Sequence, residues 1–220
     1  MTTSLGSIHE DLLALPAGSI AAQALEFVIR VESTPIANHS VRSYLFARLL
    51  ARHRHLRPGH DYDDDLLFLA CVLHDVGLTD EGNRHQRFEV DGADVAAEFL
   101  TERGMADDAV ETVWEAIALH TSSGVAERRG PICRLTRAGV GLDFGADRDV
   151  ITDAAARQIH AAYPRFSIAR QITDAIVAQV RVRPEKGPRY SLPGDLLRER
   201  ETAPHLTAIE AATLSGRWGE

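Results

Sequence analysis

The chain has 220 residues, of which 45% are hydrophobic and 25% charged, which is typical of a soluble globular protein with one large domain. Its net charge of -8 and pI near 5.7 argue against a general affinity for nucleic acid or anionic membranes. No secretory signal, membrane span or disulfide framework is indicated, so the cytoplasm is the expected location.

Apolar residues recur with a helical period along most of the chain, and no alternating strand pattern or internal repeat interrupts them. Helices are predicted at 19–33, 38–55, 62–77, 91–104, 106–122, 130–147, 149–164 and 167–184. Beyond 184 the pattern thins to a loop, a short helix and a weakly ordered tail. We therefore expect an all-α fold with an N-terminal segment at 1–17, one helical domain at 18–183 and a peripheral C-terminal extension at 184–220.

The segment LACVLHDVGLTD draws attention because a buried apolar run ends in an adjacent imidazole and carboxylate, His74 and Asp75. A histidine at the end of a helix is favoured by the helix dipole, which is the plain structural explanation. A metal ion, in contrast, requires such a pair together with further ligands. The rest of the chain supplies two candidates for these.

His39 begins the predicted helix 38–55, and Asp143 lies in the apolar, glycine-rich segment GVGLDFG. Taken singly, His39 is explained as a polar residue at a helix start, and Asp143 as the partner of an arginine. A buried carboxylate is costly unless it is paired or binds a metal. Two imidazoles and two carboxylates form a mixed nitrogen and oxygen set that suits zinc, manganese or iron better than calcium.

The order His…His-Asp…Asp on helices resembles the HD-domain superfamily of metal-dependent hydrolases. The resemblance implies that His39, His74, Asp75 and Asp143 bind a divalent metal ion, with zinc favoured, and that Asp75 is also catalytic. The segments NHSVRSYLFARLLA, ACVLHDVGLT and RFEVDGADVAAEFL are similar to the cyanamide hydratase-like branch. Namesake members of that branch use zinc to add water to a nitrile-type carbon.

Two positions depart from other branches of the superfamily. Leu78 stands where many phosphohydrolase members carry a lysine, and Phe88 stands where binuclear members usually carry a histidine. The resemblance therefore implies a single ion and an uncharged substrate.

Further residues are assigned to the site by the resemblance and by their position in the sequence. His120 is expected to donate a proton or to support the ligands, although a satisfied core or helix-end histidine would look the same. A solvated loop is the better explanation for His85. The residues expected to line the substrate pocket are Leu78, His85, Arg87, Phe88 and Glu89.

The leading hypothesis is a mononuclear hydrolase or hydratase. Its metal would lower the pKa of a bound water toward ~7 and supply hydroxide to a small nitrile- or amide-like compound. The alternative is a phosphohydrolase acting on nucleotides or other phosphorylated metabolites, with Arg84, Arg87, Arg128 and Arg129 replacing the missing lysine. A third hypothesis is a non-catalytic HD-type module. A small-molecule substrate is the expected partner, with no nucleic acid or membrane, and a homo-oligomer is left open.

Overall fold

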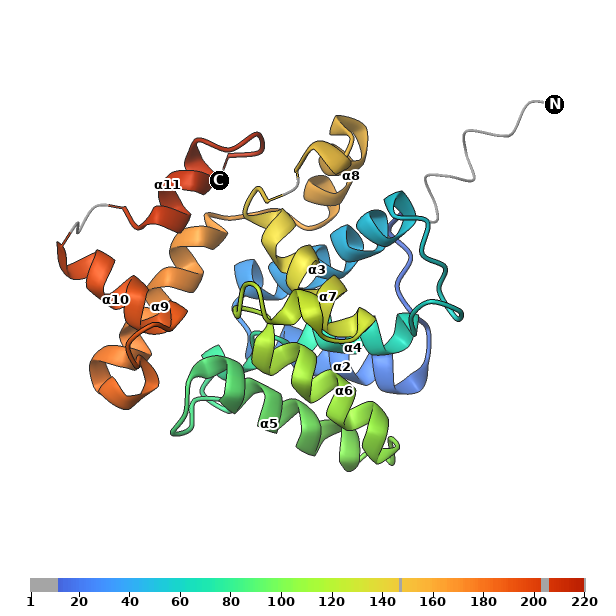
Figure 1. The fold of residues 1–220 in the computed structure, drawn as a ribbon, viewed down its shortest axis with the longest axis horizontal. Coiled ribbons are helices and arrows are strands. Elements are labelled where there is room, and N and C mark those ends of the chain that lie inside the picture. Colours follow the sequence, from blue (N-terminus) through green and yellow to red (C-terminus); the bar gives the residue numbers. More distant parts are fainter. Residues whose placement is uncertain (1–11, 147, 203–205, 220) are drawn as a thin grey trace.

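The protein is built from α-helices, which confirms the all-α prediction (Figure 1). The computed structural model describes residues 12–146, 148–202 and 206–219, so most of the segment predicted at 1–17 lies outside the described residues. Within the described ranges, no helix combines the length and apolar character needed to cross a membrane. The α-helices are α2 (Ser19–Val31), α3 (Thr34–His53), α4 (Asp64–Leu73), α5 (Phe88–Thr101), α6 (Asp107–Leu119), α7 (Pro131–Asp143), α8 (Asp153–Ala162), α9 (Ile168–Val182), α10 (Leu192–Thr202) and α11 (Ala208–Leu214). Short 3-10 helices are η1 (Val76–Leu78), η2 (Ala126–Arg128), η3 (Arg148–Val150) and η4 (Pro184–Lys186).

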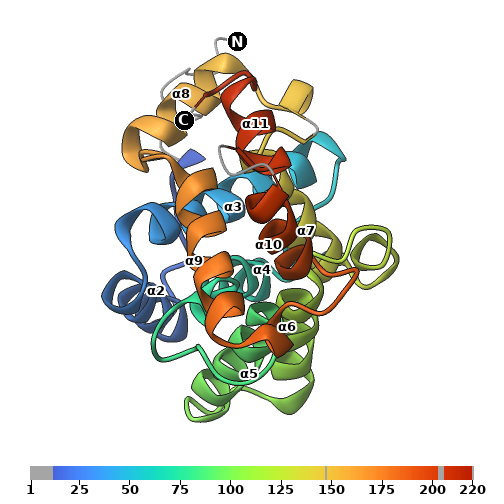
Figure 2. The same ribbon diagram turned by 90° about the vertical axis from the view of Figure 1, so that its left-hand side faces the viewer.

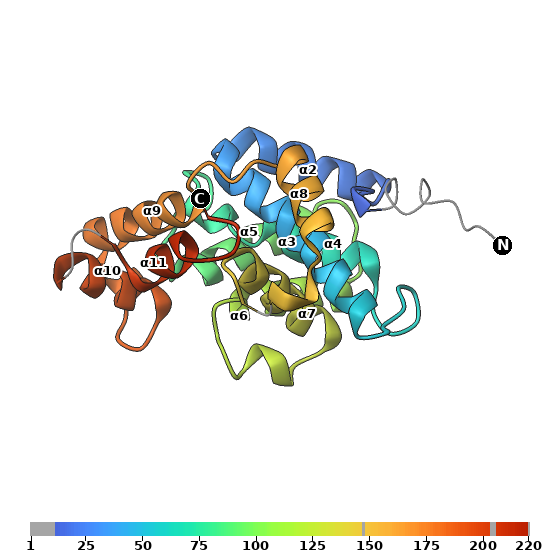
Figure 3. The ribbon, with the colours of Figure 1, turned by 90° about the horizontal axis from the view of Figure 1, so that it is seen from above.

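Helix α4 forms the centre of the main core, as its apolar run predicts. Every residue from 67 to 73 is buried, and α2, α3, α6 and α7 pack around the helix (Figure 3). The Asp63 side chain caps the first turn by accepting a hydrogen bond from the Leu66 backbone N–H at 3.0 Å. The helix ends at Leu73, so His74 and Asp75 follow directly from the most buried element of the fold.

Helix α3 begins at Thr34, four residues before the predicted start at Asn38. Pro35 lies in its first turn, where a helix needs no backbone N–H donor, so the proline starts this helix rather than separating it from α2. Asn38 is therefore inside the helix, where its side chain donates to the Pro164 carbonyl at 2.9 Å. His39 consequently lies in the second turn of α3 and is completely buried.

Two glycines allow backbones to approach closely beside these residues. A Cβ on Gly139 of α7 would lie 2.2 Å from the Ser43 carbonyl oxygen of α3. A Cβ on Gly77 would lie 2.0 Å from the Phe88 carbonyl oxygen at the start of α5. Gly139 of α7 thus permits the close crossing that brings Asp143 next to His39.

The C-terminal helices α9, α10 and α11 form a group on one side of the molecule, with α10 and α11 packed against α9 (Figure 2). They have their own apolar cluster, which includes Ile172, Ile176 and Leu196 and also receives Phe88 from α5. Helix α11 lies in the tail that was expected to be weakly ordered. The sequence carries a signal for it, because Thr207 and Glu210 form a capping box at its start.

Polar contacts anchor this C-terminal group to the loop that follows the His74–Asp75 pair. The Lys186 ammonium lies 2.5 Å from an Asp91 carboxylate oxygen, and both side chains are 1% exposed. The Gln179 side chain donates to the Gly77 carbonyl at 2.9 Å, and Arg183 donates to the Asn83 carbonyl at 2.9 Å. These contacts attach the C-terminal group firmly to the rest of the protein.

We expect Lys186→Met to lower the free energy of unfolding by about 3–5 kcal/mol, because Asp91 would remain as a buried carboxylate without its cation. The matched control is Arg170→Met, which breaks an exposed pair with Asp174 at 3.6 Å and should cost about 0–1 kcal/mol. Denaturant unfolding at fixed pH measures both. Equal, small losses for the two variants would contradict the anchoring role.

Candidate metal centre

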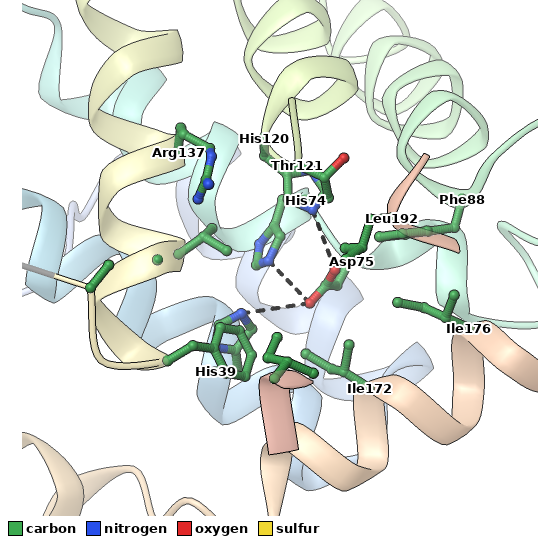
Figure 4. A pocket seen from close by; sticks show the side chains of 15 residues that line it. His39, His74, Asp75, Phe88, His120, Thr121, Arg137, Ile172, Ile176 and Leu192 are labelled. Atoms are coloured by element: carbon green, nitrogen blue, oxygen red, sulfur yellow. Dashed lines mark ion pairs between the residues drawn. The ribbon is translucent and has the colours of Figure 1, made fainter. Parts of the chain in front are cut away.

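Three side chains from two segments converge on one point beneath the surface. His39 comes from α3, while His74 caps the end of α4 and Asp75 follows it. One ligand atom from each lies within 4.8 Å of the others, and all three residues are buried. The Asp75 Oδ2 atom lies 3.0 Å from His74 Nε2 and 3.8 Å from His39 Nε2 (Figure 4).

Hydrogen bonds on the outer nitrogen of each ring fix its orientation. His39 Nδ1 donates to Asp143 at 2.6 Å, and His74 Nδ1 donates to the Cys71 carbonyl at 2.7 Å. Each Nε2 atom therefore faces the shared point. Among the described residues, neither Nε2 atom nor Asp75 Oδ2 has a hydrogen-bond partner, which is an expensive arrangement for buried polar atoms.

The electrostatic environment keeps Asp75 ionised and His39 neutral. Burial opposes the charge of Asp75, but the surrounding histidines, His74 first, lower its pKa to about 2. Burial lowers the pKa of His39, although Asp143 partly compensates. Burial also disfavours the charged form of His74, but the charge of Asp75 outweighs it and raises the His74 pKa. A carboxylate and an imidazole with a free lone pair are the protonation states that a metal requires.

This arrangement fits a divalent metal ion. Three converging ligand atoms without protein partners form a nitrogen and oxygen donor set with room for further ligands, as in open metal sites. The hydrogen bonds on the two Nδ1 atoms are the outer contacts that orient metal-binding histidines. Phe88, where a second site would need a ligand, instead contributes an apolar ring to the pocket.

The structure places Asp143 outside the group of three converging ligand atoms. Its two oxygens accept hydrogen bonds from Arg42 at 2.6 and 2.9 Å and from Arg165 at 2.7 Å, in addition to that from His39. The carboxylate therefore lies on the Nδ1 side of the His39 ring, facing away from Nε2. Burial opposes its charge, but Arg42 and the other donors hold its pKa well below the usual value.

Arg42 is a functional residue that the sequence reasoning missed. It is completely buried and lies three residues after His39, on the same face of α3. A fully buried arginine requires a buried anion, and its position three residues after His39 was the available signal in the sequence. The structure agrees with the other explanation for Asp143, which is pairing with an arginine, because Arg42 and Arg165 both contact it.

His120 lies at the end of α6, with its ring 4.8 Å from that of His74. Its Nδ1 donates to the Ile117 carbonyl at 2.7 Å, while its Nε2 lies 4.0 Å from Asp75 Oδ1. Burial first, and then the charge of His74, lower its pKa to about 3. His120 is therefore neutral and presents a lone pair, not a proton, to the site.

Glu89 lies behind the pocket wall at the start of α5. Its Oε1 accepts a hydrogen bond from the Thr121 hydroxyl at 2.5 Å, and burial raises the pKa of its carboxyl group. The Oε2 atom has no partner among the described residues and is 3.8 Å from the Arg87 guanidinium. Glu89 thus reaches the pocket through Thr121, which lines it.

A pocket of about 270 Å³ opens above the converging ligand atoms (Figure 4). Of the residues expected to line it, Phe88 does so, whereas Leu78 packs into the apolar cluster of the C-terminal helices and His85 is exposed on its loop. Arg87 lies before α5 and approaches Glu89 instead. The described residues that line the pocket are His39, His74, Asp75, Phe88, His120, Thr121, Arg137, Val140, Gly141, Phe144, Ala146, Ile172, Ile176, Leu192 and Ile209. Those contributed by α7 and by the C-terminal helices were not found from the sequence.

We expect His74→Ala and Asp75→Ala each to abolish stoichiometric metal binding, because each removes one of three converging ligand atoms. The unmodified protein should hold one ion per chain. Elemental analysis after dialysis measures this, and circular dichroism checks that the helices persist. Two ions per chain, or full metal content in both variants, would refute the assignment.

Asp143→Asn should behave differently from these variants. The ligand atoms remain, but the ring of His39 loses its charged anchor, so metal affinity should fall by about 10–100-fold while one ion per chain still binds. The visible spectrum of the cobalt-loaded protein should keep its shape, since the ligand set is unchanged. Asp195→Asn, at an exposed pair with Arg198, is the control. A changed cobalt spectrum would show that Asp143 is itself a ligand.

Comparison with known proteins agrees with this geometry. A family model described as HD domain matches residues 36–158, a region that begins in α3, ends in α8 and contains His39, His74, Asp75 and His120. The chain is also similar to Cyanamide hydratase DDI2 and Cyanamide hydratase DDI3 of Saccharomyces cerevisiae. Each is 27% identical to it over 158 residues, which cover 69% of this chain and 68% of the relative. Since the family model spans more than half of its 220 residues, the chain belongs to the HD domain family of metal-dependent hydrolases.

Proposed function

We propose that the protein is a metal-dependent hydratase that adds water to a small, neutral nitrile- or amide-like compound, with cyanamide as the reference substrate. The observation that carries the proposal is the convergence of three unpartnered ligand atoms, on His39, His74 and Asp75, at the base of a largely apolar pocket. The similarity to two cyanamide hydratases supports the choice of substrate class.

The reaction requires water to be activated and a proton to be moved. A divalent ion bound by this set supplies the first requirement, because it acidifies water and polarises the group under attack at neutral pH. Asp75 contributes to both water activation and proton movement. Its Oδ2 atom faces the two imidazoles, and its Oδ1 atom faces His120 across 4.0 Å. Asp75 therefore orients water toward His120.

His120 is the group that moves the proton in this proposal. Because it is neutral, with Nε2 directed at Asp75, it first accepts a proton from the water whose oxygen bonds to the nitrile carbon. It then returns that proton to the nitrogen as the triple bond opens. The O–H proton of the resulting imidic acid then also moves to the nitrogen, so both water protons finish on nitrogen and the product is an amide or, from cyanamide, urea. In this proposal His120 is a proton shuttle, whereas the sequence suggested only a proton donor.

Thr121 and Glu89 provide a second polar contact at the pocket wall. The Thr121 hydroxyl donates to Glu89, so its oxygen lone pairs remain available to accept a hydrogen bond from a substrate amino group. A cyanamide-like substrate carries such a group next to its cyano carbon. This contact would orient the substrate without adding charge to the pocket.

The charge of the pocket bears on the phosphohydrolase alternative. Of the arginines proposed to replace the missing lysine, Arg84 pairs with Glu98 and Arg129 pairs with Glu115, while Arg87 and Arg128 are not among the described lining residues. Arg137 is the observation that favours the alternative, since it is the one lysine or arginine among those lining residues. A single cation beside Asp75 gives little compensation for a phosphate monoester of about two negative charges.

A substrate panel tests the proposal. With zinc and then with manganese, hydration of cyanamide to urea should exceed phosphate release from nucleoside monophosphates. His120→Asn should lower kcat by about 10²–10⁴-fold with metal content unchanged, whereas His60→Asn, at an exposed histidine, should have no effect. Phosphate release without cyanamide turnover would reverse the ranking, and loss of metal in His120→Asn would make His120 a ligand.

A further inference from the structure

The pocket is far larger than cyanamide requires. Its volume is about 270 Å³, whereas cyanamide is only an amino group joined to a cyano group. The volume lies just below the range of about 300–1,000 Å³ that is typical of pockets for drug-sized ligands. The site therefore has room for a substituent beyond the reacting group.

The pocket has an apolar part that the C-terminal helices contribute. Asp75 and the histidines line the pocket together with Phe88 and Phe144, whose rings contact His120 and His39. Four aliphatic side chains come from the C-terminal helices: Ile172, Ile176, Leu192 and Ile209. Figure 4 shows Ile172 and Ile176 projecting from α9 toward Asp75, with Leu192 nearby. Leu192 and Ile209 are only partly buried, so an apolar ligand here would remove apolar surface from water. We call these four residues the aliphatic wall.

The aliphatic wall is held in place before any ligand arrives. Arg200 of α10 makes two hydrogen bonds to Glu210 of α11, at 2.9 and 3.0 Å, and a third to Asp174 of α9 at 2.7 Å. These contacts join all three helices. The buried pair of Lys186 and Asp91 then fixes the group to the first turn of α5. A preformed wall binds without a large ordering penalty.

The aliphatic wall also lies outside the part of the chain that defines the family. The HD domain match ends at residue 158, and α9 begins at Ile168. The ligand atoms thus come from the shared domain, and the residues around the far end of the pocket come from helices added to it. With this division, the shared domain carries the reacting groups and the C-terminal helices select the substrate.

We propose that the substrate is a nitrile-type compound with an apolar substituent several carbons long, and that the aliphatic wall binds this substituent. The inference rests on the proposed hydratase function. The reacting group sits beside Asp75 and His120, and the hydrocarbon chain extends toward α9, α10 and α11. Each methylene that enters the pocket should raise kcat/KM about threefold to fourfold until the pocket is filled.

The test compares cyanamide with methyl-, ethyl-, propyl- and butylcyanamide on the zinc-loaded, full-length protein. We expect kcat/KM to rise along the series. Leu192→Ala and Ile209→Ala should each reduce the ratio of kcat/KM for butylcyanamide to that for cyanamide by several-fold. Val182→Ala, at a residue of α9 that is 80% exposed, is the control and should leave the ratio unchanged.

Binding of the corresponding products provides a readout without turnover. Calorimetry with urea and the alkylureas on metal-free protein should show affinity that increases with chain length, and Leu192→Ala should weaken this increase. Turnover of cyanamide with no gain along either series would overturn the aliphatic-wall proposal and leave the hydratase proposal standing. Turnover of no member of the series would overturn the hydratase function and, with it, the substrate assigned here.

Discussion

The outward hydrogen bonds of three imidazole rings are the constraint on which the site depends. His39, His74 and His120 each donate through Nδ1, to Asp143, the Cys71 carbonyl and the Ile117 carbonyl. This fixes the orientation of every ring and turns each Nε2 toward Asp75. Two of the acceptors are backbone carbonyls three residues earlier in the same chain segment, so the helix ends themselves orient His74 and His120. Only His39, inside a helix, needs a side-chain anchor from another element.

That anchor explains why Asp143 sits among cations. A buried carboxylate is stable only if it is compensated, and here Arg42 and Arg165 surround it. The close crossing of α3 and α7 at Gly139 makes the contact possible. The cost of burying this network and the unpartnered ligand atoms is offset by the apolar core around α4. A buried apolar core thus supports polar atoms that have no partner among the described residues, which is the usual relation between a rigid scaffold and a functional site.

The C-terminal helices connect the outer part of the pocket to the same scaffold. The chain's single lysine, Lys186, is completely enclosed with Asp91, and Asp91 also accepts the backbone N–H groups of Arg84 and Gln86. One carboxylate therefore orders the loop between the metal centre and α5 and holds the helices that carry the aliphatic wall. Lys186 is far from the site residues along the chain, yet its contacts with Asp91 and Asn83 help to hold the helices that carry the aliphatic wall.

The sequence by itself determined the helical class, the burial of the α4 run and the pairing of His74 with Asp75, because these follow from local periodicity and adjacency. It also marked His39, although Pro35 shifted the start of its helix. Only the tertiary structure showed that Asp143 anchors His39, because this contact depends on how α3 and α7 cross and on the positions of Arg42 and Arg165. It likewise decided that Leu78 packs against α9 and that the pocket is completed by Ile172, Ile176, Leu192 and Ile209. Residues so distant along the chain meet only through packing, and a periodic pattern shows which face of a helix is apolar but not which neighbour covers it.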